Sequence, residues 1–154
     1  MERIQIICNP NAGRQMIQKN ISRLITLLEG ENKEVHLTYT KGKFDAEDMA
    51  FESCSRGYDI IISVGGDGTV NEIVNGIMKS PNKAKLAIYP AGTVNDFGSY
   101  LKIPKNVDEF SQMIIVGDTK RVDVGSSGER YFLNVAAAGL LPEVAHKVSS
   151  EAKS

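Results

Sequence analysis

A continuous apolar strand followed directly by glycines limits the fold of this chain more than any other feature. The segment YDIIISV (58–64) shows no alternation of polar and apolar side chains, which is typical of a strand buried on both faces of a parallel sheet. It leads into GGDGT (65–69) and then into an amphipathic helical pattern over residues 70–77. Strand, tight turn and helix in this order predict a layered α/β fold.

The same alternation recurs over the first 118 residues. Strands are expected at 4–8, 34–39, 58–64 and 85–90, and helices at 15–29, from 45, from about 69, at 95–100 and at 107–116. Such alternation predicts a doubly wound parallel sheet. Residues 119–139 instead resemble two strands around a Gly/Ser turn, so an antiparallel β unit is expected to begin there. The predicted domains are 1–118 and 119–154.

Local signals predict where several helices begin and end. Asp45 is expected to cap the second helix, with Phe44 packing on Met49 as a hydrophobic staple. Gly30 and Gly117 are expected to end the helices that precede them.

Composition excludes several function classes. A net charge of −1 gives no support to a nucleic-acid surface or a polybasic membrane anchor. The apolar runs fall far short of the ~20 residues that span a bilayer, and the N-terminus lacks the layout of a signal peptide. Cys8 and Cys54 are expected to be buried thiols in a reducing cytoplasm. His36 and His146 are assigned to the surface.

The glycine segment has the composition of a phosphate-binding loop. Gly65, Gly66 and Gly68 follow a strand, at the edge of an α/β sheet where ligands bind. Without side chains they let a phosphate approach backbone amides, and a helix beginning near Thr69 adds partial positive charge. The segment is not a P-loop, because it has no Gly-Lys-Ser/Thr ending, nor a dinucleotide fingerprint, because Asn71 replaces the third glycine.

Asp67 is a carboxylate where phosphate is expected. A magnesium ion bridging the phosphates, directly or through water, makes a carboxylate favourable there and points to phosphoryl transfer from a nucleoside triphosphate. Alternatively, Thr69 and Glu72 form a capping box and Asp67 is only a turn residue. Both interpretations can hold together.

Four segments of the sequence resemble the soluble bacterial diacylglycerol kinases and the wider lipid kinase family that includes sphingosine kinases. They are NPNAGR (9–14), GGDGTVNEIVNGI (65–77), YPAGTVNDFGSYL (89–101), and VDVG with RYFLNVAAAG (122–139). GGDGT is shared with NAD kinases and, more distantly, phosphofructokinases, whereas GTVNDF (92–97) separates the chain from both.

The resemblance implies an α/β domain of the NAD kinase/diacylglycerol kinase type and an ATP-dependent lipid kinase that uses Mg²⁺. Asp67 is implied as the catalytic residue and as a metal contact, indirect through Mg–ATP. The residues implied in nucleotide binding are Asn9, Pro10, Asn11, Ala12, Gly13, Thr40, Gly66, Asp67, Gly68, Thr69, Val70, Asn71, Glu72 and Thr93.

Several of these residues also have a purely structural interpretation. Asn9-Pro10 can simply turn the chain, Thr40 can close a strand, and Thr93 with Asp96 repeats a helix-cap pattern. The cations in the neighbouring loops are assigned to solvated surface: Arg14, Lys41 and Lys43.

Members of the resembled family are about twice this length. Their β-rich second domain carries the base that deprotonates the lipid hydroxyl and a structural magnesium site, and the lipid pocket lies between the domains. The chain is therefore expected to be a nucleotide-binding fragment that ends early in a truncated second domain; a natural short form is the alternative.

A non-catalytic regulatory module and a kinase for sphingoid lipids or NAD also stay open. The expected partners are ATP and a membrane-presented lipid, with a cytoplasmic location, peripheral membrane contact and a homodimer as further possibilities.

Overall fold

The four expected strands form one parallel sheet. β1 (Arg3–Cys8), β2 (Glu34–Tyr39), β3 (Ile60–Gly65) and β4 (Lys85–Pro90) lie in the order β2-β1-β3-β4. The computed structural model describes residues 1–12, 14–91, 101–117 and 119–133. All of β3 and all but the first residue of β1 are buried, as their continuous apolar sequences predict.

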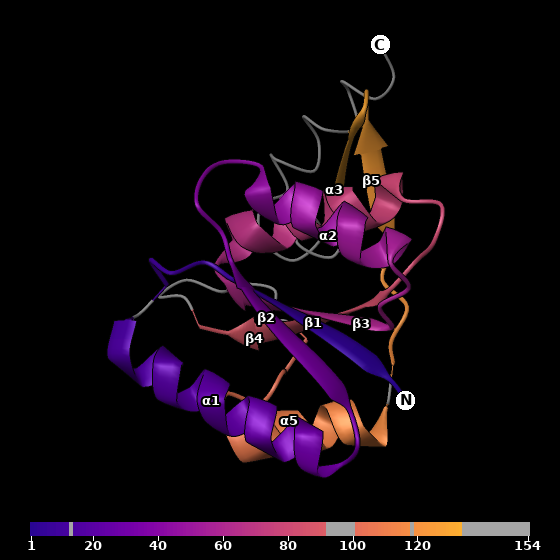
Figure 1. Cartoon of the computed structure of the whole chain (residues 1–154). Helices are drawn as coiled ribbons and strands as arrows, with labels where there is room; N and C mark the ends of the chain where they lie inside the picture. Colours follow the sequence, from indigo (N-terminus) through magenta and orange to yellow (C-terminus); the bar gives the residue numbers. More distant parts are fainter. Residues whose placement is uncertain (13, 92–100, 118, 134–154) are drawn as a thin grey trace.

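Two layers of helices cover the sheet. α1 (Arg14–Gly30) and α5 (Val107–Val116) lie on one face, and α2 (Asp45–Ser55) and α3 (Asp67–Lys79) lie on the other (Figure 1). Side chains of β3 alternate between the layers, since Ile60 and Ile62 join the α1/α5 core whereas Ile61 joins the α2/α3 core. The doubly wound α/β fold expected from the sequence is thereby confirmed.

The order of the strands reverses between β1 and β3, and a ligand crevice is expected at the carboxyl ends of two such strands. The chain leaves β1 through α1 to β2 on one side, then returns through α2 to β3 on the other side of β1. Because parallel crossovers are right-handed, α1 and α3, which follow β1 and β3, cover opposite faces of the sheet. The segments that leave the carboxyl ends of β1 and β3 therefore diverge, which is where open α/β sheets bind ligands.

The connection between β3 and α3 is tighter than the sequence suggests. β3 extends through Gly65, and α3 begins at Asp67 rather than near Thr69. Gly66 is the helix N-cap, with φ −93° and ψ −169°. One extended residue thus joins a buried strand to a helix.

Other helix ends differ in detail from the expected ones. Asp45 does not cap α2, because its carboxylate accepts hydrogen bonds from the backbone nitrogens of Lys41 (2.7 Å) and Gly42 (3.0 Å) in the preceding loop. Phe44 is itself the N-cap, in a left-handed conformation with φ 70°. Gly117 ends α5 with φ 79°, as expected. The short helix expected at 95–100 lies outside the described residues.

α1 continues through Gly30 instead of stopping before it. The left-handed residue after this helix is Asn32, with φ 59°. Asparagine tolerates this conformation through its short polar side chain, so it takes the role expected of the glycine.

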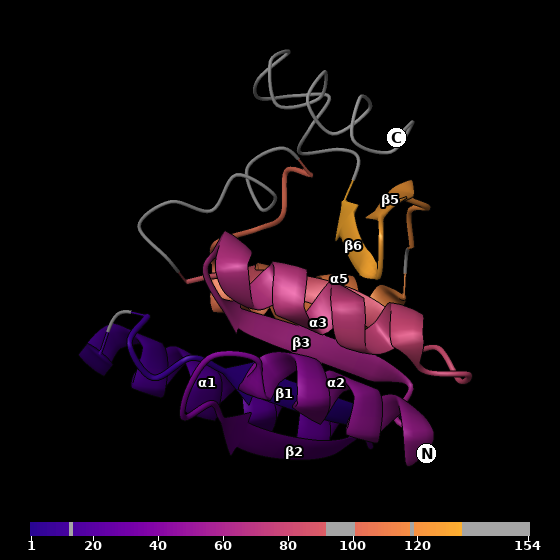
Figure 2. The same cartoon turned by 90° about the horizontal axis from the view of Figure 1, so that it is seen from above.

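An antiparallel hairpin follows the α/β layers, as expected. β5 (Val124–Ser127) pairs with β6 (Arg130–Leu133), and Gly128 has φ 61° in the turn between them. β6 lies along α3 (Figure 2), where Leu133 packs with Val70 and Val74 of the helix. The division of the chain after residue 118 stays a prediction.

The two cysteines and His36 have the surroundings expected of structural residues. Cys8 and Cys54 are buried and unbridged, and burial raises the pKa of the Cys8 thiol to about 11. His36 is exposed, and its Nε2 lies 2.9 Å from Oε1 of Glu34. His146 lies outside the described residues. No helix within the described ranges combines the length and apolar character needed to cross a membrane.

Gly76 permits the close crossing of α2 and α3, and Gly76→Ala should destabilise the protein. An added methyl group would meet the backbone carbonyl of Glu47 and lie 2.8 Å from Cβ of Ala50. Alanine favours a helix by about 1 kcal/mol over glycine, but overpacking costs about 1–3 kcal/mol and should dominate. Urea unfolding measures the change. In the control Gly30→Ala, no described atom lies within 4 Å of the added methyl, so stability should be kept or raised by up to about 1 kcal/mol. Equal behaviour of the two variants would contradict this account.

Candidate functional site: the glycine loop at the carboxyl edge of the sheet

Three loops meet at the carboxyl ends of β1, β2 and β3. The backbone nitrogen of Asn9, just after β1, donates to the carbonyl of Val64 on β3 at 2.8 Å. That of Thr40, just after β2, donates to the carbonyl of Cys8 at 2.9 Å. The hydrogen-bond ladder thus continues beyond the strands and holds the first residue of each loop beside its neighbour.

The amino end of α3 points into this region. The first intrahelical bond runs from the nitrogen of Val70 to the carbonyl of Gly66 at 3.2 Å. The backbone amides of residues 67–69 precede that bond, so their N–H groups point along the axis at the helix start. Gly66 has no side chain with which to bond them, and the helix adds partial positive charge at this end. The geometry suits an anion.

The glycines of the glycine loop (residues 65–69) have different roles. A Cβ at Gly65 would lie 2.6 Å from Oγ1 and 2.9 Å from Cβ of Thr69, and 3.3 Å from Cβ of Asn9. Gly65 therefore allows β3, α3 and the loop after β1 to pack together. Around Gly68, which is exposed, no described atom lies within 4 Å of an added Cβ. Its backbone can be approached from outside.

The loop after β1 is a tight turn built on Asn9. The side-chain oxygen of Asn9 accepts a hydrogen bond from the nitrogen of Asn11 at 3.0 Å, and its carbonyl accepts one from Ala12 at 3.1 Å. Asn9 therefore makes the turn that the structural interpretation assigns to it. Pro10 and Asn11 are exposed beside the crevice, and Gly13 lies outside the described residues.

The first turns of α3 separate the expected site residues by exposure. Asp67 is half-buried at the first helical position, Thr69 is buried and Val70 is fully buried in the core. Val70 can therefore contact a ligand only through its backbone. Asn71 is exposed and Glu72 is half-buried.

The capping-box interpretation is wrong. Its Thr69 would have to be the N-cap, whereas the N-cap is Gly66 and Thr69 is the third residue of the helix. The side chain of Thr69 packs against Gly65 instead.

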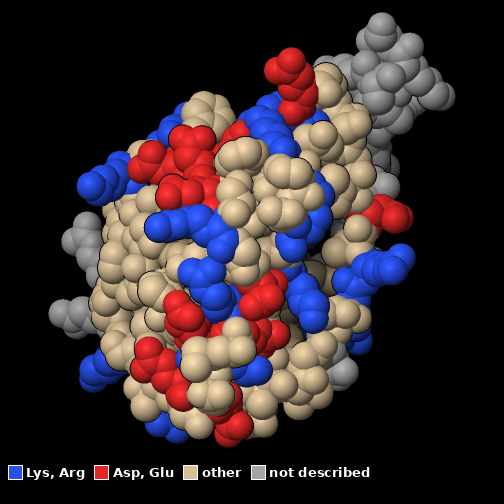
Figure 3. Space-filling model, turned by 45° about the vertical axis from the view of Figure 1, so that its right-hand side comes forward, with Lys and Arg blue, Asp and Glu red and all other residues tan. Residues whose placement is uncertain are grey.

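Both signs of charge occur near the site, at Lys41 and Lys43 in the loop after β2 and at Asp67 in the first turn of α3. On the face shown in Figure 3, which is the side of the amino ends of the strands, Lys and Arg also lie among Asp and Glu. Lys41 and Lys43 are exposed, as expected for solvated surface. Within the described ranges, no three His, Cys, Asp or Glu side chains group so as to hold a metal ion. Thr93 and the side chain of Arg14 lie outside the described part of the chain.

Comparison with known proteins decides the family. Residues 3–127 match the diacylglycerol kinase catalytic domain. The chain belongs to this family. A diacylglycerol kinase of Staphylococcus saprophyticus is 39% identical over 153 residues, which cover 99% of this chain and 50% of the relative. One from Staphylococcus haemolyticus is 41% identical over 150 residues, which cover 97% and 46%.

A solved structure supports the same family. The crystal structure of a diacylglycerol kinase from Bacillus anthracis aligns with a TM-score of 0.72 and 34% identity, over 85% of this chain and 48% of that one. The chain thus spans about half the length of the relatives it matches. The recognition made from the four sequence segments is confirmed.

Sequence reasoning missed a second group of polar residues on the far half of α3. Asn75 is fully buried there and Glu47 is buried on α2 beside it, with Gly76 between the two helices. Asn and Gly are poor helix formers, so an Asn-Gly pair inside a helical pattern was the available signal. It indicates a tertiary contact without naming the partner.

Alanine substitutions at Gly65 and Gly68 distinguish a glycine that close packing requires from one at an open position. Gly65→Ala should destabilise the protein by about 1–3 kcal/mol, because Cβ of Thr69 cannot rotate away from the added methyl group. Gly68→Ala should leave the free energy of unfolding unchanged or raise it by up to about 1 kcal/mol, because the position is open and alanine favours a helix over glycine. Chemical unfolding of both variants tests this, and a destabilising Gly68→Ala beside a neutral Gly65→Ala would reverse the assignment.

Proposed function

We propose that this chain supplies the nucleotide-binding part of an ATP-dependent lipid kinase, which transfers the γ-phosphoryl group to diacylglycerol or a similar lipid hydroxyl. The observation that supports this most strongly is the amino end of α3. Its amides face the crevice between β1 and β3, and an exposed glycine leaves room for phosphate. The relatives named diacylglycerol kinase supply the reaction class.

The described residues fit Mg–ATP. The amides at the start of α3 and the turn on Asn9 are proposed to hold the phosphates, with Thr40 at the neighbouring strand end and Gly13 and Thr93 included through the family resemblance. Asp67 is proposed to bind the magnesium ion that accompanies the nucleotide, directly or through water, because it is half-buried beside those amides. When bound, Mg²⁺ neutralises charge on the phosphates and so removes their repulsion by the carboxylate.

The acceptor side is proposed to depend on sequence that the relatives have and this chain does not match. The general base and most of the lipid pocket are assigned to that second half. We further propose a cytoplasmic location with peripheral contact to the membrane that presents the lipid. Homodimer formation stays a prediction.

Asp67→Ala should weaken the magnesium dependence of ATP binding more than it weakens metal-free binding. The carboxylate has no favourable contact with bare phosphate, so it contributes only when the cation is present. Calorimetric titration with ATP, with and without Mg²⁺, measures both affinities. Asp48→Ala is the matched control, because it removes an exposed carboxylate from the first turn of the neighbouring helix α2. If Asp67→Ala and Asp48→Ala behave alike, Asp67 is not a metal contact.

Lipid phosphorylation should require more than residues 1–154. General-base catalysis alone contributes on the order of 10²–10⁴ in rate, and the base is proposed to lie elsewhere. We therefore expect no phosphatidic acid from labelled ATP and diacylglycerol micelles with this chain alone. A fusion to the unmatched second half of the S. saprophyticus relative should form it, and Asp67→Ala in that fusion should abolish it.

The outcomes of this assay separate the alternatives. Rapid lipid phosphorylation by residues 1–154 alone would place the base within them. A fusion that binds Mg–ATP but phosphorylates neither diacylglycerol nor a sphingoid base would favour the regulatory module. Phosphorylation of NAD in the same assay would favour the NAD kinase alternative.

A further inference from the structure

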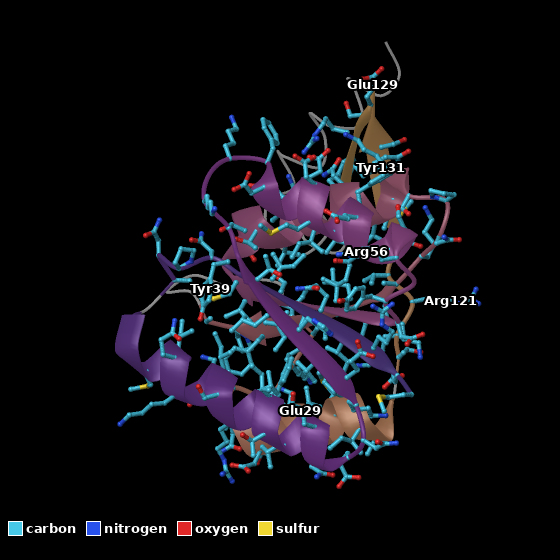
Figure 4. The ribbon with its side chains drawn as sticks, viewed as in Figure 1. Glu29, Tyr39, Arg56, Arg121, Glu129 and Tyr131 are labelled. Atoms are coloured by element: carbon cyan, nitrogen blue, oxygen red, sulfur yellow. The ribbon has the colours of Figure 1, made fainter. Side chains whose placement is uncertain are left out.

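The side chain of Asn75 makes the same pair of hydrogen bonds to strand β6 that the backbone of a neighbouring strand would make. It is fully buried in α3, yet its amide contacts the backbone of Tyr131 on β6 at two points. Nδ2 donates to the carbonyl of Tyr131 at 3.0 Å, and Oδ1 accepts from the nitrogen of Tyr131 at 2.8 Å. Nδ2 also donates to the carbonyl of Asn71 at 2.8 Å. Figure 4 labels Tyr131 beside α3, and Glu129 at the tip of the hairpin.

A buried carboxylate, paired with two partly exposed cations, joins the same strand to α2. Glu47 accepts from Arg130 of β6 at 2.7 Å and from Lys79 of α3 at 2.5 Å, and only 11% of its side chain is exposed. Burial opposes ionisation of Glu47, but the hydrogen bonds from Lys79 and Arg130 outweigh it and hold the pKa of the carboxyl below its usual range. Helices α2 and α3 and strand β6 thus meet at one carboxylate.

These polar contacts fix the register of β6 against α3, which the apolar contact between the two elements does not fix. Leu133 packs on Val70 and Val74 of α3, and such packing is tolerant of small shifts along the strand. A two-point bond to a single residue allows one register only. A buried amide and a buried carboxylate add little to the free energy of unfolding compared with apolar side chains of similar size. Their main effect is therefore to fix the position of β6.

We propose that Asn75, together with the Glu47–Arg130 pair, is a latch that fixes the hairpin β5–β6 relative to the glycine loop. α3 is one continuous helix from Asp67 to Lys79, so Asn75 lies about two turns behind the amino end that faces the crevice. Asn75, Glu47 and Arg130 are positioning residues. The latch sets the position of β6 relative to the proposed phosphate site. Its effect on phosphoryl transfer rests on the proposed function.

The distance between the first turns of α3 and the tip of the hairpin tests the latch without any nucleotide. Cys8 and Cys54 are buried, so spin labels can be attached selectively to Asn71→Cys and Glu129→Cys, both at exposed positions. Pulsed electron spin resonance should give one narrow distance in this labelled parent. Asn75→Asp keeps the shape but places an oxygen against the carbonyls of Tyr131 and Asn71, and Arg130→Met leaves Glu47 paired with Lys79. Both variants should lose the single narrow distance.

The matched control is Ile77→Val, which removes a buried methylene from the side of α3 that packs on α2 and the sheet, away from the hairpin. It should keep the narrow distance while lowering stability. Hydrogen exchange at the Tyr131 amide should accelerate about tenfold or more in Asn75→Asp, because the new oxygen repels the Tyr131 carbonyl where Nδ2 donated before, and the strand moves away from the helix. A narrow, unchanged distance in folded Asn75→Asp and Arg130→Met would overturn the proposal.

Two functional measurements distinguish positioning from nucleotide binding. In the chain without spin labels, Asn75→Asp should bind Mg–ATP within about twofold of the unsubstituted protein, because packing among Gly65, Thr69 and Asn9 holds the helix start independently. A loss as large as that of Asp67→Ala would overturn the positioning role. In the active fusion, Asn75→Asp should raise KM for the lipid without raising KM for ATP, and Ile77→Val should change neither. An inactive parent fusion would count against the proposed function, while the spin-label distances still decide the latch.

Discussion

The contact of Gly65 with Thr69 and Asn9 decides where the amino end of α3 lies. Because Gly65 has no side chain, the last residue of a buried strand can touch the third residue of the following helix and the first residue of the loop after β1. A helix starting one residue after the strand must point its first amides at the sheet edge. The position proposed for the anion is therefore a consequence of packing in the core.

The aspartate in this loop balances two electrostatic effects. The helix start favours negative charge, so Asp67 is stabilised there before any ligand binds. The same carboxylate disfavours bare phosphate but favours phosphate that carries a divalent cation. At the proposed site, this loop would therefore favour the metal-bound form of a nucleotide over the metal-free form.

Sequence alone predicted the sheet because its strands are short apolar runs with clear turn signals, as the buried β3 shows. It placed the glycine loop at the correct edge for the same reason. It misjudged the helix start, because Thr69 and Glu72 match a capping box while the N-cap is Gly66, which carries no such signal. It also missed the left-handed Phe44, since an aromatic residue is rare in that conformation.

The role of Asn75 could not be predicted from the sequence. A polar residue beside an apolar helical stripe does not name its partner, and Tyr131 is 56 positions away in the chain. Only the folded arrangement of α3 and β6 brings the amide to the strand. The sequence contains the interacting groups, but their pairing depends on long-range topology.

Backbone amide chemical shifts during titration with Mg–ATP test most directly whether phosphate binds at the start of α3. The largest changes should fall on the amides of Gly66, Gly68 and Thr69 and on that of Asn11 in the facing loop, and they should shrink when Mg²⁺ is removed. Changes concentrated on α5 or on the hairpin β5–β6, with the glycine loop unaffected, would show that the nucleotide binds elsewhere.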